Sequence, residues 1–147
     1  MTIRIVKATR NHLVTAADDL SKGDREEFHC MHANRDPREV LPEALNEDTH
    51  AIMAGSLVIA VGGVVDDCIW FVTTNAREML DKGERMQFYK LLKEHLAVVR
   101  DKHNRIFTNL VSKDNALHIR LLESLGATFQ SGHTMSPAGF QFKQFWI

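Results

Sequence analysis

This 147-residue chain has few cysteines, no long apolar run and no marked excess of one charge sign. The two cysteines, Cys30 and Cys68, form no Cys-x-x-Cys pair, which favours free thiols in a reducing compartment over a disulfide framework. No run of about 18 apolar residues occurs, so we expect no membrane-spanning helix. The formal net charge of −1 argues against a surface that binds nucleic acid or anionic membrane as a whole. Because Met1–Ile5 reads as a strand rather than an apolar signal segment, we expect a cytoplasmic protein.

Hydrophobic residues form 44% of the chain, which suits a single domain over residues 1–147 with one core. Alternation and helical periodicity predict elements in the order β, α, α, β, β, β, α, β, α, β, β. The predicted strands cover residues 3–6, 50–54, 57–65, 68–73, 106–111, 127–130 and 140–145. The predicted helices lie within residues 11–35, where a break at 21–24 makes two of them, then after Asp81, and at 115–126. Pro37 and Pro42 make residues 35–49 the most loop-like segment.

Two Asp-x-x-Glu capping boxes are predicted to open helices. Asp24 with Glu27 is expected to cap the second early helix, and Asp81 with Glu84 the long one. In the long helix an apolar stripe recurs at helical spacing, at Phe88, Leu92, His95, Leu96 and Val99. We therefore expect this helix to pack one face against the sheet.

The order of the elements indicates a mixed sheet. The long helix joins the strands at 68–73 and 106–111, which implies a right-handed parallel crossover. The earlier strands are joined by turns too short for anything but antiparallel pairing. The predicted fold class is therefore α/β (α+β), with antiparallel N-terminal strands and a parallel pair around the central helix.

The stretch from Asn115 to Ala127 reads as an amphipathic helix, a glycine stop and the start of a strand. It resembles the acyl-CoA-binding end of the GNAT N-acetyltransferase fold, where an Asn opens a helix ending in Glu-x-Leu-Gly-Phe. The positions that match are Asn115, Ile119, Leu121, Glu123, Leu125 and Gly126. Where active members usually have a tyrosine general acid, this chain has Leu122. The resemblance thus implies the fold more directly than the activity.

The same resemblance implies acetyl-CoA or CoA as the ligand. A strand edge would pair with the pantetheine arm, and a helix N-terminus would hold the pyrophosphate. The residues implied in cofactor binding are Phe71, Val72, Thr73, Lys82, Gly83, Glu84, Arg85, Asn115 and His118. The family's Arg/Gln-x-x-Gly-x-Gly/Ala loop corresponds to residues 77–85, which contain one glycine. A capping Asp81 would occupy the phosphate position and repel a diphosphate, whereas Lys82 and Arg85 could pair with it.

No residue is assigned a catalytic role from the sequence. Tyr89, the only tyrosine, lies within the long helix and reads as an aromatic residue at the edge of the core. His118 lies one turn before Leu122, on a neighbouring face, and either titrates near neutrality in a site or is an ordinary surface histidine. Asn115 is equally well explained as a helix cap. Thr73 could face an acyl group or satisfy the backbone at a strand end.

Three further patterns have ordinary structural interpretations. His29 and His32 could share a helical face and a metal, but no second ligand pair is nearby, so we expect no metal. Cations from Lys90 to Arg105 alternate with Glu94 and Asp101, as on a solvated helix face, so no nucleic-acid partner is expected. The closing aromatic cluster is interpreted as sheet core rather than a docking patch; its members are Phe140, Phe142, Phe145 and Trp146.

Residues 50–147, with the opening Thr2–Arg4, also resemble a narrower family, the internal virion protein A family of short-tailed lytic phages. The motifs are Trp70-Phe71-Val72-Thr73 and His118-Ile119-Arg120, followed by Leu122, Gly126, Ala127 and Phe129. Members of that family are themselves divergent GNAT-like domains, and residues 10–50 would form a variable lobe.

Two classes of function follow from these resemblances. The leading hypothesis is an acyl-CoA-dependent acetyltransferase, or a CoA-cleft protein, that acts on a host protein or metabolic enzyme in the cytoplasm of the infected bacterium. The alternative is a non-catalytic virion or morphogenesis protein, or a module that binds a host enzyme through residues 35–49. The degraded phosphate loop and Leu122 favour the alternative, and the intact helix around Asn115 favours the enzyme.

Overall fold

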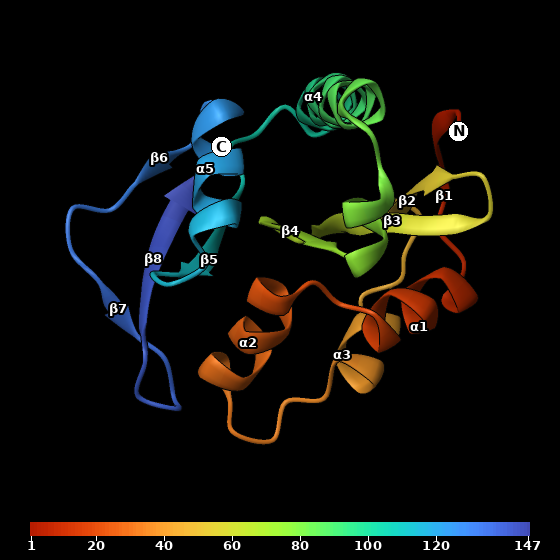
Figure 1. Ribbon diagram of the computed structural model, residues 1–147. Helices are drawn as coiled ribbons and strands as arrows, with labels where there is room; N and C mark the ends of the chain where they lie inside the picture. Colours follow the sequence, from red (N-terminus) through yellow and green to blue (C-terminus); the bar gives the residue numbers. More distant parts are fainter.

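The computed structural model describes all 147 residues and is built around one eight-stranded mixed sheet (Figure 1). The strand order is β1-β2-β3-β4-β5-β8-β6, with β7 paired to β8. The strands are β1 (Ile3–Lys7), β2 (His50–Ala54), β3 (Leu57–Val65), β4 (Cys68–Thr73), β5 (Thr108–Ser112), β6 (Thr128–Phe129), β7 (Thr134–Met135) and β8 (Gln141–Trp146). The helices are α1 (Arg10–Asp18), α2 (Lys22–Met31), α3 (Pro37–Glu43), the 3-10 helix η1 (Asn75–Met79), α4 (Lys82–His103) and α5 (Ala116–Ser124).

The pairing of the strands confirms the predicted mixed sheet. Strands β1 to β4 are antiparallel neighbours, β4 and β5 are parallel, and β5 and β8 are antiparallel. The parallel pair is in register only at Cys68 and Thr108. Beyond that point β4 and β5 diverge, so the sheet is split for most of the length of both strands.

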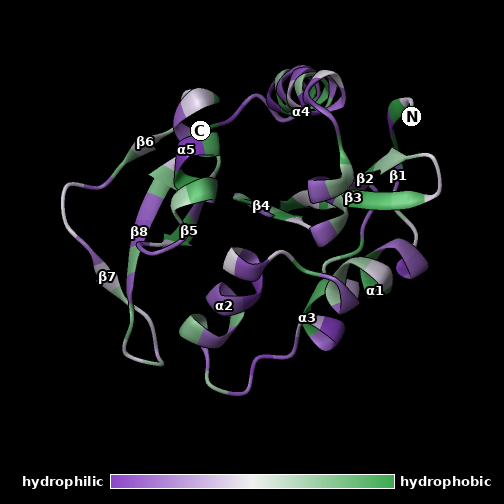
Figure 2. Ribbon diagram, viewed as in Figure 1, coloured by the Kyte–Doolittle hydropathy of each residue, from purple (hydrophilic) through white to green (hydrophobic).

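Helices cover both faces of the sheet. Figure 1 shows α4 along one face, α1, α2 and α3 on the other, and α5 beside β5. One core cluster packs Leu13, Phe28 and Val61 under α1–α3, and another packs Ile59 and Phe88 under α4. Figure 2 shows the hydrophobic β3 between these layers, with hydrophilic residues on the outer turns of the helices. The split between β4 and β5 therefore lies between two helical layers.

Helix α4 begins as the sequence predicts. The side chain of Asp81 accepts a hydrogen bond from the Glu84 backbone N–H at 2.8 Å, and the Asp81 N–H donates to the Glu84 carboxylate at 3.0 Å. The buried residues of α4 are Phe88, Leu96 and Val99, three members of the predicted stripe. The helix ends at Asn104, whose left-handed φ of 47° suits a helix C-terminus.

Two predictions about residues 21–49 were wrong. Asp24 does not cap α2: Ser21 is the N-cap residue, and Asp24 lies inside the first turn, 4% exposed, with its carboxylate turned toward β4 and α5. Residues 37–43, expected to be loop, form α3. Asp36 caps this helix by accepting from the Arg38 N–H at 2.9 Å, and Pro37 occupies the first turn, where its missing N–H is harmless.

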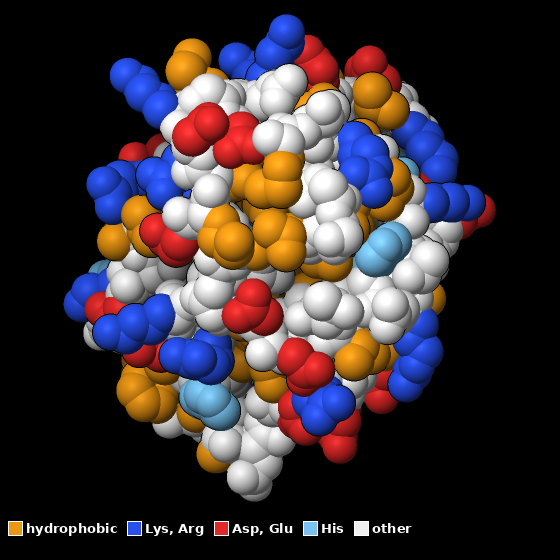
Figure 3. All heavy atoms as spheres, turned by 45° about the vertical axis from the view of Figure 1, so that its right-hand side comes forward, with side chains coloured by type: hydrophobic (Ala, Val, Ile, Leu, Met, Phe, Trp, Pro, Cys, Tyr) orange, Lys and Arg blue, Asp and Glu red, His pale blue; other side chains and the backbone are white.

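The surface carries both charge signs in mixture. On the face in Figure 3, lysine and arginine side chains are scattered among acidic ones and do not gather into one patch. Along α4, Lys90 lies 4.0 Å from Glu94, an ordinary pair one turn apart. None of the helices is both long and apolar enough to cross a membrane.

Candidate functional site: a cleft between β4 and β5

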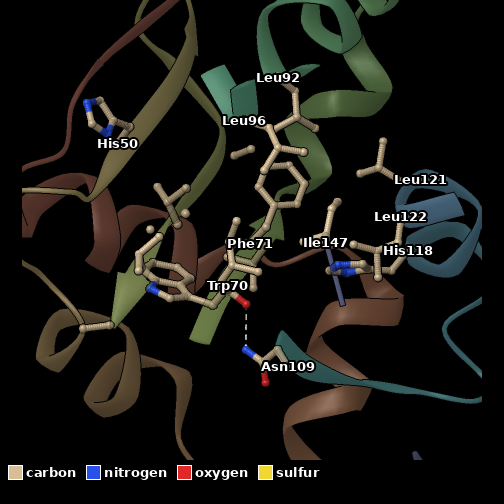
Figure 4. A pocket seen from close by; sticks show the side chains of 18 of the residues that line it. His50, Trp70, Phe71, Leu92, Leu96, Asn109, His118, Leu121, Leu122 and Ile147 are labelled. Atoms are coloured by element: carbon tan, nitrogen blue, oxygen red, sulfur yellow. Dashed lines mark hydrogen bonds between the residues drawn. The ribbon is translucent and has the colours of Figure 1, made fainter. Parts of the chain in front are cut away.

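A cavity of about 310 Å³ lies where β4 and β5 diverge (Figure 4). Most of its lining side chains are hydrophobic, and the lining includes stretches of β3 and β4 and side chains of α4, α5 and α2. Figure 4 shows Leu92 and Leu96 on one side, Leu121 and Leu122 on another, and Phe71 between them. The divergence of two parallel strands has thus produced an apolar cleft through the middle of the sheet.

The edge of β4 that faces this cleft is blocked at both ends. Below, the Asn109 amide donates to the Ile69 carbonyl at 2.8 Å (Figure 4). Above, the Thr73 N–H donates to the Asp24 carboxylate at 2.8 Å, and the Thr73 carbonyl accepts from the Ser21 N–H at 2.9 Å. Alternation along a strand points Phe71 to the same edge as Ile69 and Thr73. Its N–H and C=O have no partner in the protein, so one residue of open strand edge faces the cleft.

A buried polar cluster closes the upper end of the cleft. It consists of Asp24 and Glu27 from α2 and of Asn115 and His118 at the start of α5. Asp24 accepts from the Asn115 amide at 2.9 Å and lies 3.3 Å from His118 Nδ1. Glu27 accepts from the Ser112 N–H at 2.6 Å. The cluster therefore ties α2 to the C-terminal end of β5 and to the first turn of α5.

The environment of this cluster shifts three pKa values. Burial opposes ionisation of Asp24, but the hydrogen bond and charge of His118, with the bonds from Thr73 and Asn115, outweigh it and lower its pKa. Burial alone would lower the pKa of His118, yet the bond and charge of Asp24 and the charge of Glu27 raise it. Burial is the main reason that the pKa of Glu27 is raised. When both are ionised, Asp24 and His118 together carry no net charge, which suits their buried position.

The N-terminus of α4 has a different character. Its first turn is largely exposed, and one of its N–H groups, that of Glu84, donates to the Asp81 carboxylate. Arg85 lies 3.8 Å from Glu78. A shallow hollow beside this turn is lined by Lys82, Gly83, Arg85, Met86, Gln87, Tyr89 and Lys90. The anion-binding end of the helix is thus capped internally, with three cations next to it.

The structure separates the sequence-predicted site residues into two groups. Phe71, Val72 and His118 line the cavity. Thr73 donates to Asp24 of the polar cluster, and Asn115 is a member of that cluster. Lys82, Gly83, Glu84 and Arg85 lie together at the α4 N-terminus, outside the cavity lining. Whether any of them contacts a cofactor stays a prediction.

Several side chains take positions that differ from their interpretation in the sequence. Asp24 and Glu27, read as a capping box, are buried partners of α5, and their spacing on one helix face next to Phe28 was the available signal. Asn115 occupies the N-cap position of α5 but makes no capping bond. His118 shares the cavity with Leu122, one turn away on the same face of α5, rather than lying on the surface.

Three other groups of candidate residues lie outside the polar cluster. Tyr89 is at the edge of the core, and its hydroxyl donates to the Ser124 carbonyl at 3.0 Å. His29 and His32 have no third metal-ligating side chain beside them. The aromatic cluster at the end of the chain divides, with Phe142 and Phe145 in the core, and Phe140 and Trp146 exposed.

Solved structures of GNAT acetyltransferases share this architecture. A GNAT-family acetyltransferase from Bacillus anthracis matches 100% of this chain and 95% of its own, with a TM-score of 0.65 and 10% identity. The PaiA N-acetyltransferase of Thermoplasma acidophilum, solved in complex with coenzyme A, matches 98% of both chains, with a TM-score of 0.59 and 12% identity. The fold is therefore that of the GNAT acetyltransferases, some of which bind CoA.

The sequence also matches a phage family. The family described as "Bacteriophage T7, probable scaffold protein Gp13" matches residues 48–134, and the chain belongs to it. The "Probable scaffold protein gp13" of Escherichia phage T7 is 33% identical over 89 residues. These residues cover 60% of this chain and 62% of the T7 protein, so less than two thirds of either chain is matched. The resemblances to GNAT proteins and to a phage protein family are confirmed. Residues 1–47, which hold β1 and α1–α3, lie outside the matched range.

Proposed function

We propose that this phage GNAT-fold protein binds an acyl thioester in the β4–β5 cleft and transfers the acyl group to a host component. The open edge of Phe71 carries the proposal, because an extended pantetheine arm needs a free N–H and C=O on this strand. The surrounding cavity is apolar and suits a short acyl group. The thioester would supply an activated acyl carbon and a thiolate leaving group.

The strand edge at Phe71 suits CoA better than the N-terminus of α4 does. At the strand, Phe71 offers the N–H and C=O that an amide-containing arm would pair with, and the cavity leaves space beside them. At α4, the Asp81 carboxylate already accepts from the N–H group that a diphosphate would need. Lys82, Arg85 and Lys90 lie close enough to that turn to hold phosphate oxygens in its place. The arm therefore binds through the cleft, and the cations contribute the phosphate contacts.

Amide hydrogen exchange tests this proposal at a single residue. In the free protein the Phe71 N–H should exchange faster than those of Trp70 and Val72, which face β3. Saturating acetyl-CoA should slow Phe71 selectively, and acetyl-pantetheine should do the same at higher concentration because it lacks the diphosphate. Unchanged Phe71 exchange at millimolar acetyl-CoA contradicts the proposal.

The acceptor in this proposal is a host protein or metabolic enzyme in the cytoplasm of the infected cell. The support is the phage family together with the GNAT fold, since a phage gains by modifying or occupying a host enzyme. Affinity capture from a host lysate, followed by mass spectrometry for acylated peptides, tests this choice. Capture without acylation favours simple occupation of the host enzyme.

A structural role in the virion is the second candidate, and two observations favour it. The family description names a scaffold protein, and Leu122 fills the position of the usual acid with a buried apolar side chain. In this second candidate role, the GNAT fold serves as a structural scaffold and catalyses no reaction. Detection of the chain at stoichiometric amounts in purified particles, with no acetyl-CoA binding by the free protein, supports this role over the first.

A further inference from the structure

His118 and Asp24 form a dyad at the upper end of the cleft. His118 Nδ1 lies 3.3 Å from Asp24 Oδ1, and both side chains are largely buried, 11% and 6% exposed. Asp24 is itself held by the Thr73 N–H at 2.8 Å, the Thr73 hydroxyl at 3.0 Å and the Asn115 amide at 2.9 Å. An imidazole fixed through Nδ1 by a carboxylate has a defined tautomer and orientation. These bonds leave Nε2 as the reactive nitrogen.

The other edge of the imidazole belongs to the cavity. His118 lines it, and its ring packs edge-on to Phe71 with ring centroids 6.1 Å apart. Figure 4 shows the ring reaching from α5 toward β4. Nε2 makes no hydrogen bond within the protein and is not among the buried polar atoms that lack a partner, so it keeps some accessible surface on a side chain that lines the cavity. The residue with the free strand edge and the residue with the free nitrogen are therefore neighbours.

We propose that His118 is the general base and the general acid of the cleft, with Asp24 as its positioning residue. This inference rests on the proposed function, because it names the proton carrier of the same site. Leu122 has no proton to give, and His118 lies one turn away on the same helix face and lines the same cavity. One histidine could then perform both transfers that acyl exchange needs.

The proton balance of the step is simple. Nε2 accepts the proton of the attacking amine, or of water, as the new bond to the acyl carbon forms. The imidazolium, stabilised by the Asp24 carboxylate, then returns that proton to sulfur as the carbon–sulfur bond breaks. Nothing else is consumed, and His118 ends in its starting state. Asp24 and Glu27 are the charged groups that raise its pKa, and burial lowers it.

The test compares His118→Asn with the wild type. Asparagine places an amide N–H near the position of Nδ1, so the bond to Asp24 can persist while Nε2 is lost. His133→Asn, at an exposed histidine outside the cleft, is the matched control. Three quantities are measured: acetyl-CoA affinity by calorimetry, CoA release from acetyl-CoA between pH 5.5 and 9, and the His118 pKa by NMR titration of the free protein.

We expect His118→Asn to bind acetyl-CoA with an affinity within a few-fold of that of the wild type. Its rate of CoA release should be lower than the wild-type rate by a factor of about 10² or more. The wild-type rate should rise with pH, with its midpoint at the NMR pKa of His118. Equal rates in the two proteins, or wild-type binding with no CoA release at any pH, overturn the role of His118 and leave the binding cleft standing. Failure of the wild type to bind acetyl-CoA overturns the proposed function and this inference together.

Discussion

At the scale of single residues, Asp24 is the side chain on which the most elements depend. It joins the start of α2, the end of β4 and the first turn of α5 through Ser21, Thr73, Asn115 and His118. Its side chain is almost completely buried, so its bonds form with little competition from water. A neutral side chain at this position would leave the His118 charge without its partner.

Asp24→Asn should therefore destabilise the protein by about 3–5 kcal/mol, the usual effect of removing one member of a buried ion pair. Urea unfolding at pH 7 measures this change. Asp101→Asn, an exposed aspartate on α4 without a hydrogen-bond partner, is the control and should change stability by less than about 0.5 kcal/mol. A loss below about 1 kcal/mol at Asp24 would show that the pair contributes little.

His95 gives a pH effect of definite sign. Burial, with a smaller contribution from the charge of His50 at a ring distance of 4.4 Å, lowers its pKa from 6.5 to about 4. The unfolded chain binds the proton first, so the stability from neutral His95 is complete above pH 6.5 and is lost as pH falls toward 4. In His95→Leu this acid-side loss should be smaller. Urea midpoints at pH 7, 5.5 and 4.5 test it, with exposed His133→Gln as control.

At the scale of elements, helix capping and phosphate binding would compete for the N-terminus of α4. Its capping box stabilises the helix, and the same N–H groups are those that a phosphate would use. Asp81→Ala should lower stability by about 1 kcal/mol. It should also strengthen acetyl-CoA binding, because it frees an N–H group and removes a negative charge. Calorimetry measures the affinity, and Asp101→Ala removes an equal charge elsewhere on the helix. Unchanged or weaker affinity in Asp81→Ala contradicts this view of the cap.

Elements whose signals are local could be predicted from the sequence. β2, β3 and β4 have the predicted bounds because turns at Gly55 and Asp66 separate alternating or continuous apolar runs. Helix α3 was missed because Pro37 and Pro42 read as loop signals, although proline is favoured in a first helical turn. The contacts within the polar cluster could not be predicted, since Asp24 and Asn115 meet only after α2 and α5 pack together.

At the scale of the whole molecule, a GNAT fold has kept its cleft and changed both ends of it. The apolar cavity, the open edge of Phe71 and the dyad of His118 and Asp24 are the features on which the proposed acyl-transfer site rests. The closed α4 cap and Leu122 depart from the usual phosphate and proton arrangements. The family match begins at residue 48, so α1–α3, which include the helix that supplies Asp24 and Glu27, lie outside the matched range.

The most direct measurement is isothermal titration of the purified protein with acetyl-CoA, with plain CoA as the control. We expect micromolar binding, tighter for acetyl-CoA than for CoA because the acetyl group enters the apolar cavity. Absence of heat together with absence of thermal stabilisation at millimolar ligand would contradict it. The cleft would then be a packing feature of a virion protein.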